Sequence, residues 1–194
     1  EKLYELDENF KLSYLKFLKF LKKKYFKFDF YYQIVLNVRV GISSKGKYPT
    51  IPDFHNDYFL GHPFEIINIW IPLTKPDIKE FHNFKICSFA TSKKIMQKFN
   101  YDLKKARKII SKKKDIKYNN YLMKNSSQVK TKFGKVLVFD PRCLHSSMKS
   151  FNHNRVSLDI RIYPKKLYDK SKYIFRGSGR KKMLFKFKNS YNLI

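Results

Sequence analysis

Two histidines and one aspartate in this sequence could bind a single metal ion. His55 and Asp57 stand two residues apart, and on a β-strand such side chains point to the same face. His145 ends the segment 134–145, which has the pattern of an apolar strand followed by a turn. If this strand lies beside the first, the three side chains form a facial triad. That arrangement is typical of non-haem Fe(II) oxygenases, because it leaves coordination positions for a co-substrate and for dioxygen.

A strand with charged residues on one face follows His145. The segment 155–161 reads Arg-Val-Ser-Leu-Asp-Ile-Arg, so its polar side chains share one face and its apolar side chains share the other. A row of charges that faces inward is costly unless it binds a ligand. Because a guanidinium matches a carboxylate in a bidentate geometry, Arg155 with Ser157 predicts a dicarboxylate site. Arg161 is the alternative anchor, and Asp159 could instead form an ion pair with it.

These motifs resemble those of the Fe(II)/2-oxoglutarate-dependent dioxygenases. More narrowly, residues 55–74 and 155–164 are similar to the phytanoyl-CoA-dioxygenase-like branch, which includes hydroxylases of sugars and other small metabolites. The resemblance covers roughly residues 31–164. It implies that a small polar metabolite, such as a sugar or amino-acid derivative, is hydroxylated while 2-oxoglutarate and dioxygen are consumed. It implies Fe(II) ligands at His55, Asp57 and His145, and a 2-oxoglutarate salt bridge at Arg155 assisted by Ser157.

Two residues of the predicted strand 66–73 also belong to this expected pocket. Asn68 and Trp70 share a face if the strand is regular. The amide of Asn68 offers both a donor and an acceptor, so we expect it to contact the co-substrate. We expect Trp70 to form a wall of the pocket.

The elements that must position these residues are mostly short strands. They are rich in β-branched and aromatic residues and are bounded by Gly, Pro or Asn, which predicts an all-β core with flanking helices, arranged as an antiparallel sandwich or jelly roll. The resemblance implies the double-stranded β-helix, a cupin-like variant of that fold. The strands are expected at 31–40, 54–59, 65–73, 85–89, 136–139 and 156–163.

We expect one domain across residues 1–194. Apolar residues at helical spacing predict an amphipathic helix over 9–28, within an N-terminal helical segment at 1–30. The jelly-roll core spans 31–164 and carries a basic helical insert at about 91–118. A C-terminal extension at 165–194 keeps aromatic residues among its charges, so we expect it to pack on the core.

The formal net charge of +28 is typical of proteins that bind nucleic acid or an anionic membrane surface. However, 36 Lys against 7 Arg, with many Ile, Asn, Tyr and Phe, indicates a bias toward A/T-rich codons. A nucleic-acid-directed oxidative demethylase is one alternative, and the spacing of Arg155 and Arg161 supports it. A non-catalytic metal-binding jelly-roll protein is another. The hydroxylase leads, because the sequence contains no lid of paired aromatics for base stacking.

The sequence also bears on location. No apolar run reaches the ~18 residues that cross a bilayer, so no membrane span is expected. Two cysteines exclude a disulfide framework and a four-cysteine zinc site. These observations predict a cytoplasmic protein.

Overall fold

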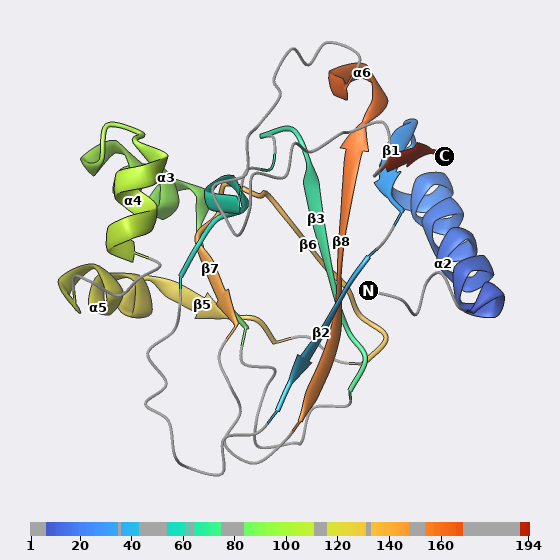
Figure 1. The fold of residues 1–194 in the computed structure, drawn as a ribbon, viewed down its shortest axis with the longest axis horizontal. Coiled ribbons are helices and arrows are strands. Elements are labelled where there is room, and N and C mark those ends of the chain that lie inside the picture. Colours follow the sequence, from blue (N-terminus) through green and yellow to red (C-terminus); the bar gives the residue numbers. More distant parts are fainter. Residues whose placement is uncertain are drawn as a thin grey trace.

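The computed structural model describes residues 7–34, 36–42, 54–60, 62, 64–74, 84–110, 116–130, 133–147, 154–168 and 191–194. They form two antiparallel β-sheets with helices on their outer sides (Figure 1). Across Figure 1 from right to left, one helix, the larger sheet, the smaller sheet and three further helices follow one another. The fold is therefore mixed α/β, and the two predicted flanking helical segments make up more of it than an all-β description allows.

The larger sheet is built around one long strand, β8 (Arg155–Pro164), which has neighbours on both edges. The order of the strands is β6-β3-β8-β1-β9, and β2 also pairs with β8. All pairings are antiparallel. The other strands are β1 (Phe30–Gln33), β2 (Asn37–Gly41), β3 (Ile67–Pro72), β6 (Leu137–Phe139) and β9 (Tyr191–Leu193).

The predicted strand 31–40 is two strands, and the register explains why. Tyr32 pairs with Ile162, and Asn37 pairs with Asp159. The advance of five residues from Tyr32 to Asn37 therefore lies opposite an advance of only three residues along β8. The two additional residues must leave the ladder, as in a bulge. Leu36 lies in this interruption and is buried in the core at 2% exposure.

The smaller sheet has the order β5-β4-β7. The predicted antiparallel pairing is thus confirmed in both sheets, but the sheets are not closed, and the described strands do not by themselves define a jelly roll. Cys87 ends the central strand one residue before a helix begins, so the predicted strand 85–89 is shorter than expected. The three strands are β4 (Phe84–Cys87), β5 (Ser126–Gln128) and β7 (His145–Ser147).

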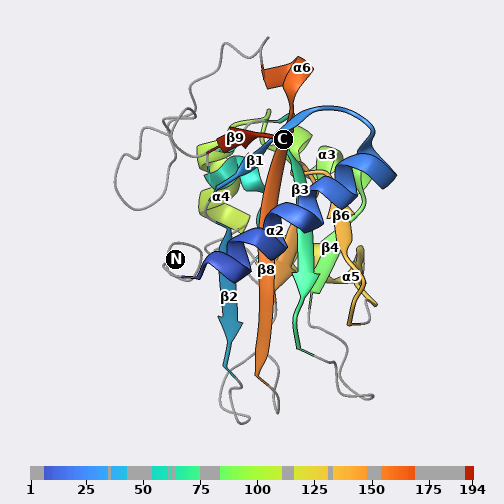
Figure 2. The ribbon, with the colours of Figure 1, turned by 90° about the vertical axis from the view of Figure 1, so that its right-hand side faces the viewer.

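The N-terminal helix covers one face of the larger sheet. Asp7 caps α2 (Glu8–Leu21) by accepting hydrogen bonds from the backbone of Asn9 and Phe10. The helix continues as a π-helical turn, η1 (Lys22–Phe26), which confirms most of the predicted helix. Figure 2 shows α2 lying across the strands of this sheet. The helix buries Tyr14, Leu18 and Leu21 against Ile69, Leu158, Ile160 and Ile162.

The lysine-rich insert is helical as predicted, but it forms three helices and the last of them ends beyond the predicted range of about 91–118. They are α3 (Phe89–Lys98), α4 (Leu103–Ile110) and α5 (Ile116–Lys124). Their apolar residues form a second core with residues of the smaller sheet and with Phe54, Phe59 and Leu144. This second core lies directly beneath the segments that carry the candidate metal ligands.

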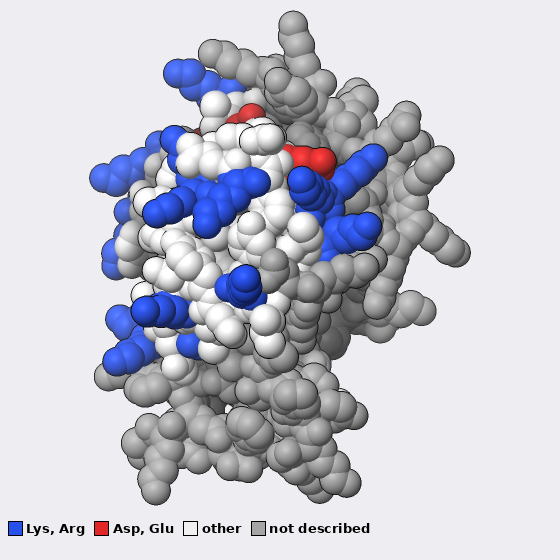
Figure 3. All heavy atoms as spheres, turned by 90° about the vertical axis from the view of Figure 1, so that its left-hand side faces the viewer, with Lys and Arg blue, Asp and Glu red and all other residues white. Residues whose placement is uncertain are grey.

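Residues 169–190 of the C-terminal extension lie outside the described residues. Directly after β8 a short helix, α6 (Lys165–Tyr168), begins, and β9 pairs with β1. Figure 3 shows the face formed by the insert, where Lys and Arg side chains lie scattered among uncharged residues. Within the described part of the chain, no helix is both long enough and apolar enough to span a membrane.

Candidate metal centre

The segment that contains His55 and Asp57 is not the strand that the sequence predicts. His55 forms an isolated antiparallel bridge with His145, in which each backbone N–H donates to the other residue's carbonyl at 2.9 and 2.8 Å. A 3-10 helix, η2 (Asp57–Leu60), begins directly afterwards. The side chain of Asn56 accepts a hydrogen bond from the N–H of Phe59 at 3.2 Å. Because asparagine competes in this way for backbone donors, it favours a turn over a continued strand.

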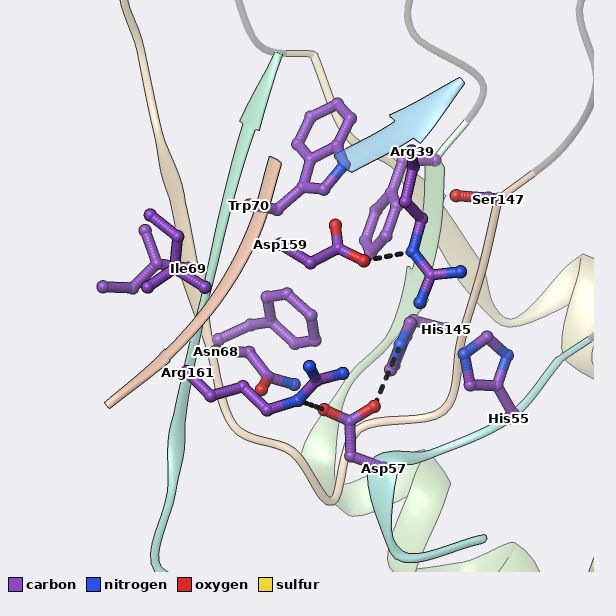
Figure 4. Close-up of a pocket in the computed structure, with 13 residues that line it drawn as sticks. Arg39, His55, Asp57, Asn68, Ile69, Trp70, His145, Ser147, Asp159 and Arg161 are labelled. Atoms are coloured by element: carbon purple, nitrogen blue, oxygen red, sulfur yellow. Dashed lines mark hydrogen bonds and ion pairs between the residues drawn. The ribbon is translucent and has the colours of Figure 1, made fainter. Parts of the chain in front are cut away.

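The three predicted ligands are nevertheless brought together. One ligand atom from each of His55, Asp57 and His145 lies within 4.8 Å of the other two. Asp57 and His145 are buried, and His55 is half-buried. Figure 4 shows the carboxylate of Asp57 directed toward His145, with the ring of His55 beside them. The backbone bridge aligns the two histidines, and the first turn of η2 adds the carboxylate.

The geometry of His145 leaves one ring nitrogen available to a metal. Its Nδ1 lies 2.9 Å from the carbonyl oxygen of Cys143, which can only accept a hydrogen bond, so Nδ1 carries the proton. Nε2 is then the free lone pair, and it lies 3.9 Å from Oδ1 of Asp57. A carbonyl behind a ligating histidine is the usual support of a metal site.

The orientation of Asp57 is set by Arg161. The Nε atom of Arg161 donates to Oδ2 of Asp57 at 3.1 Å, and both side chains are buried. The backbone N–H of Asp57 also donates to the carbonyl of Pro141 at 3.1 Å. One carboxylate oxygen is therefore held by a guanidinium, which leaves the other, Oδ1, directed toward the histidines.

Burial and charge give these groups unusual protonation behaviour. Burial alone would raise the pKa of Asp57, but Arg161 and the surrounding imidazoles outweigh it, so the pKa lies well below its usual range. Burial lowers the pKa of His145, against the opposing influence of Asp57. Burial also lowers the pKa of the neighbouring His62 to about 3. A carboxylate that stays ionised and an imidazole that stays neutral are the states that bind a metal.

A cavity of about 50 Å³ lies beside the three ligands, between the two sheets. One wall is aromatic: Trp70 stacks on Phe84 at 5.0 Å, Phe84 stacks on His145 at 5.6 Å, and Phe139 meets His145 edge-on at 5.0 Å. The predicted position of Trp70 in the wall of the pocket is confirmed. Asn68 also lines the cavity, and its Oδ1 is buried without a hydrogen-bond partner among the described residues.

Strand β8 has the two faces that the alternation of its residues predicts. Leu158, Ile160 and Ile162 pack in the core with α2. Arg161 and Asp159 line the cavity on the other face. Asp159 is paired with Arg39 of the neighbouring strand β2, not with Arg161.

The predicted co-substrate residues Arg155 and Ser157 lie further along the same face of β8 and do not line the cavity itself. Arg155 donates through Nη2 to Oγ of Ser147 at 3.1 Å, and Ser147 does line it. The Nε and Nη1 atoms of Arg155 and the Oγ atom of Ser157 are buried without partners in the described part of the chain. These are donors that a bound anion could satisfy.

The sequence interpretation missed two residues that shape the site. Arg39 lines the cavity from β2, and its alternation with apolar neighbours in Val38-Arg39-Val40 was the available signal. Ser92, at 1% exposure, accepts a hydrogen bond from the N–H of Leu144 at 2.9 Å and donates to the carbonyl of Ser88. It fixes the residue before His145 to α3, and a serine on the apolar side of a predicted helix could have indicated such a role.

Comparison with known proteins does not assign this chain to a family. No protein-family model matches it, and no curated protein matches it. The site must therefore be interpreted from its own chemistry. Two imidazole nitrogens and one carboxylate oxygen, close enough to share one ion, are a donor set that suits Fe(II) and also other divalent transition metals.

Proposed function

We propose that this chain is an Fe(II)- and 2-oxoglutarate-dependent oxygenase that hydroxylates a small polar metabolite, and that its two sheets belong to a double-stranded β-helix of the phytanoyl-CoA-dioxygenase-like branch. The observation that carries the proposal is the triad of His55, Asp57 and His145, which lines the same cavity as the charged residues of β8. Bound Fe(II) would supply the activation of dioxygen and the oxidative decarboxylation of 2-oxoglutarate to succinate.

The residues around the cavity have distinct parts in this proposal. His55, Asp57 and His145 hold the ion, and Arg161 keeps Asp57 in place. The aromatic wall of Trp70, Phe84 and Phe139 keeps water from the site, which strengthens every electrostatic interaction within it.

Charge favours a dianionic co-substrate. The two arginines that line the cavity are balanced by Asp57 and Asp159. A divalent cation and the nearby Arg155 leave the site net positive. The buried donors of Arg155 and Ser157 would bind the distal carboxylate. A cavity of about 50 Å³ holds roughly 4 water-sized probes, so 2-oxoglutarate can enter only if side chains move. The partly exposed pair of Arg39 and Asp159 is the candidate for this movement.

Succinate formation tests the proposal. The purified protein should convert 2-oxoglutarate to succinate with Fe(II), ascorbate and air, and His145→Ala should abolish this turnover. Arg155→Met should raise the KM for 2-oxoglutarate about ten-fold or more with a smaller change in kcat, because a charge-assisted contact is lost. Arg107→Met on α4 is the matched control and should behave as the wild type. Full turnover by His145→Ala would disprove the assignment.

A non-catalytic metal-binding protein is the second candidate, and the small volume of the cavity favours it. Such a protein binds Co²⁺ at the triad, with a visible absorption band that His145→Ala removes, but forms no succinate. Metal binding without succinate formation would therefore select this candidate. Absence of both would reject the metal centre itself.

A further inference from the structure

A second cavity, much larger than the first, lies on the other side of the metal-ligand segment. Its volume is about 470 Å³, within the range of small-molecule sites. Asn56 lines this cavity, whereas its neighbours His55 and Asp57 line the first one. Consecutive residues of one segment thus line both cavities.

The wall of the second cavity is apolar and largely aromatic. Phe64, Phe89 and Tyr101 are 44%, 42% and 54% exposed, which is unusual for large hydrophobic side chains gathered around one hollow. Met96 and Leu103 complete the apolar lining. Asn100 and Tyr101 have φ angles of 49° and 56°, the left-handed conformation, and this turn at the end of α3 brings Tyr101 to the cavity. A flat aromatic ligand would cover these rings.

The polar groups that face the cavity are donors. The backbone N–H of Phe59 donates to Oδ1 of Asn56, so one oxygen of this lining residue is already used within the protein. Asn56 is 1% exposed, and Nδ2 has no hydrogen-bond partner among the described residues. Ser92 is the exception, since its hydroxyl is already used by the backbone of Ser88 and Leu144. A buried amide donor without a partner favours a ligand that brings an acceptor.

The charge around the cavity is that of a site for a monoanion. Arg142 stacks on Phe89 at 4.4 Å, but its charge is met by Asp140, with contacts of 2.6 to 3.0 Å. Lys93 lies on the wall, and the described part of the chain gives it no acidic partner. One uncompensated cation together with the donors of Asn56 matches a carboxylate.

We propose that this second cavity binds a small carboxylate with an aromatic body. Its carboxylate would accept hydrogen bonds from Nδ2 of Asn56 and from Lys93, while its ring packs among Phe64, Phe89 and Tyr101. The proposal does not depend on the proposed oxygenase activity, because none of these residues is a metal ligand.

Fluorescence titration of the metal-free full chain with 2-naphthoate tests this site. Saturable binding with one ligand per chain is expected, and the neutral methyl ester should bind at least about five-fold more weakly, since it lacks the charge that Lys93 meets. In ¹⁵N NMR spectra of the same sample, the side-chain amide signals of Asn56 should shift on binding.

Three variants locate the ligand. Lys93→Gln should weaken binding about five-fold. Lys94→Gln changes a neighbouring exposed lysine of the same helix that does not line the cavity, and it should leave binding unchanged. Leu103→Trp places a bulkier ring at the wall of the cavity and should weaken binding. Equal affinities for the acid and its ester, equal effects of the two lysine variants, or full binding to Leu103→Trp would overturn the proposal.

Discussion

Strand β8 and the segment 54–62 bring charged residues to the same cavity by different means. The strand is regular over ten residues and pairs with three other strands, so its side-chain directions follow from alternation alone. The described residues of this segment form one bridge and one short turn, and their geometry depends on individual hydrogen bonds such as those from His55 to His145 and from Phe59 to Asn56. Regular structure positions the side proposed to bind an anion, and irregular structure positions the candidate metal ligands.

The largest expected effect is on the apolar face of β8. Ile160→Asp buries a carboxylate at a position with 1% exposure, facing α2, and should destabilise the protein by about 5 kcal/mol or more. Urea unfolding followed by circular dichroism measures this loss. Val138→Asp, at 44% exposure in the same sheet, is the control and should have little effect. Similar unfolding midpoints for the two variants would mean that the faces of β8 are not as described.

Removing the carboxylate from the irregular segment should come next. Asp57→Ala takes from the buried Arg161 its 3.1 Å carboxylate partner, and breaking such a pair costs about 3–5 kcal/mol. The metal-free protein should show this in urea unfolding. The double variant Asp57→Ala/Arg161→Met should recover part of the loss, because the charge disappears as well. If the loss of unfolding free energy in the double variant equals the sum of the losses in Asp57→Ala and Arg161→Met, the two side chains are not coupled.

A pH dependence should also originate in this segment. The pKa of His62 is lowered to about 3 in the fold, against about 6.5 when unfolded, so the neutral form is the stable one. The stability it provides is present above pH 6.5 and is lost as the pH falls toward 3. Between pH 7 and pH 5 the loss should be about 2 kcal/mol, and His62→Gln should lack it. Identical pH profiles of the free energy of unfolding in the two proteins would contradict the burial of His62.

The smallest effect concerns the partly exposed ion pair of β2 and β8. The side chains of Arg39 and Asp159 are 46% and 20% exposed, so Asp159→Asn should cost less than about 1 kcal/mol. High salt should remove the difference from the wild type, because it screens exposed charges. Thermal unfolding at low and high salt measures this, and a difference that persists in 1 M salt would show that the pair is more buried than described.

This contrast explains what could be predicted from the sequence. The faces of β8 and the amphipathic helix α2 follow from periodicity. The candidate metal ligands follow from residue type, since the strand expected to align His55 with Asp57 does not form. The split of strand 31–40 follows from neither, because it depends on the register against β8. The turn after His55 depends on one side-chain contact of Asn56. The partner of Asp159 could not be chosen either, since Arg39 comes from a strand distant in sequence.

The alternation along β8 has a practical consequence for protein engineering. Its even-numbered positions, 158, 160 and 162, lie in the apolar core with α2, while the odd-numbered positions 159 and 161 line the cavity. A combinatorial library at position 159 can therefore retune ligand selectivity with the hydrophobic framework left intact, whereas position 161 also holds the buried partner of Asp57. Randomising positions 158 and 162, which do not line the cavity, would instead sample stability.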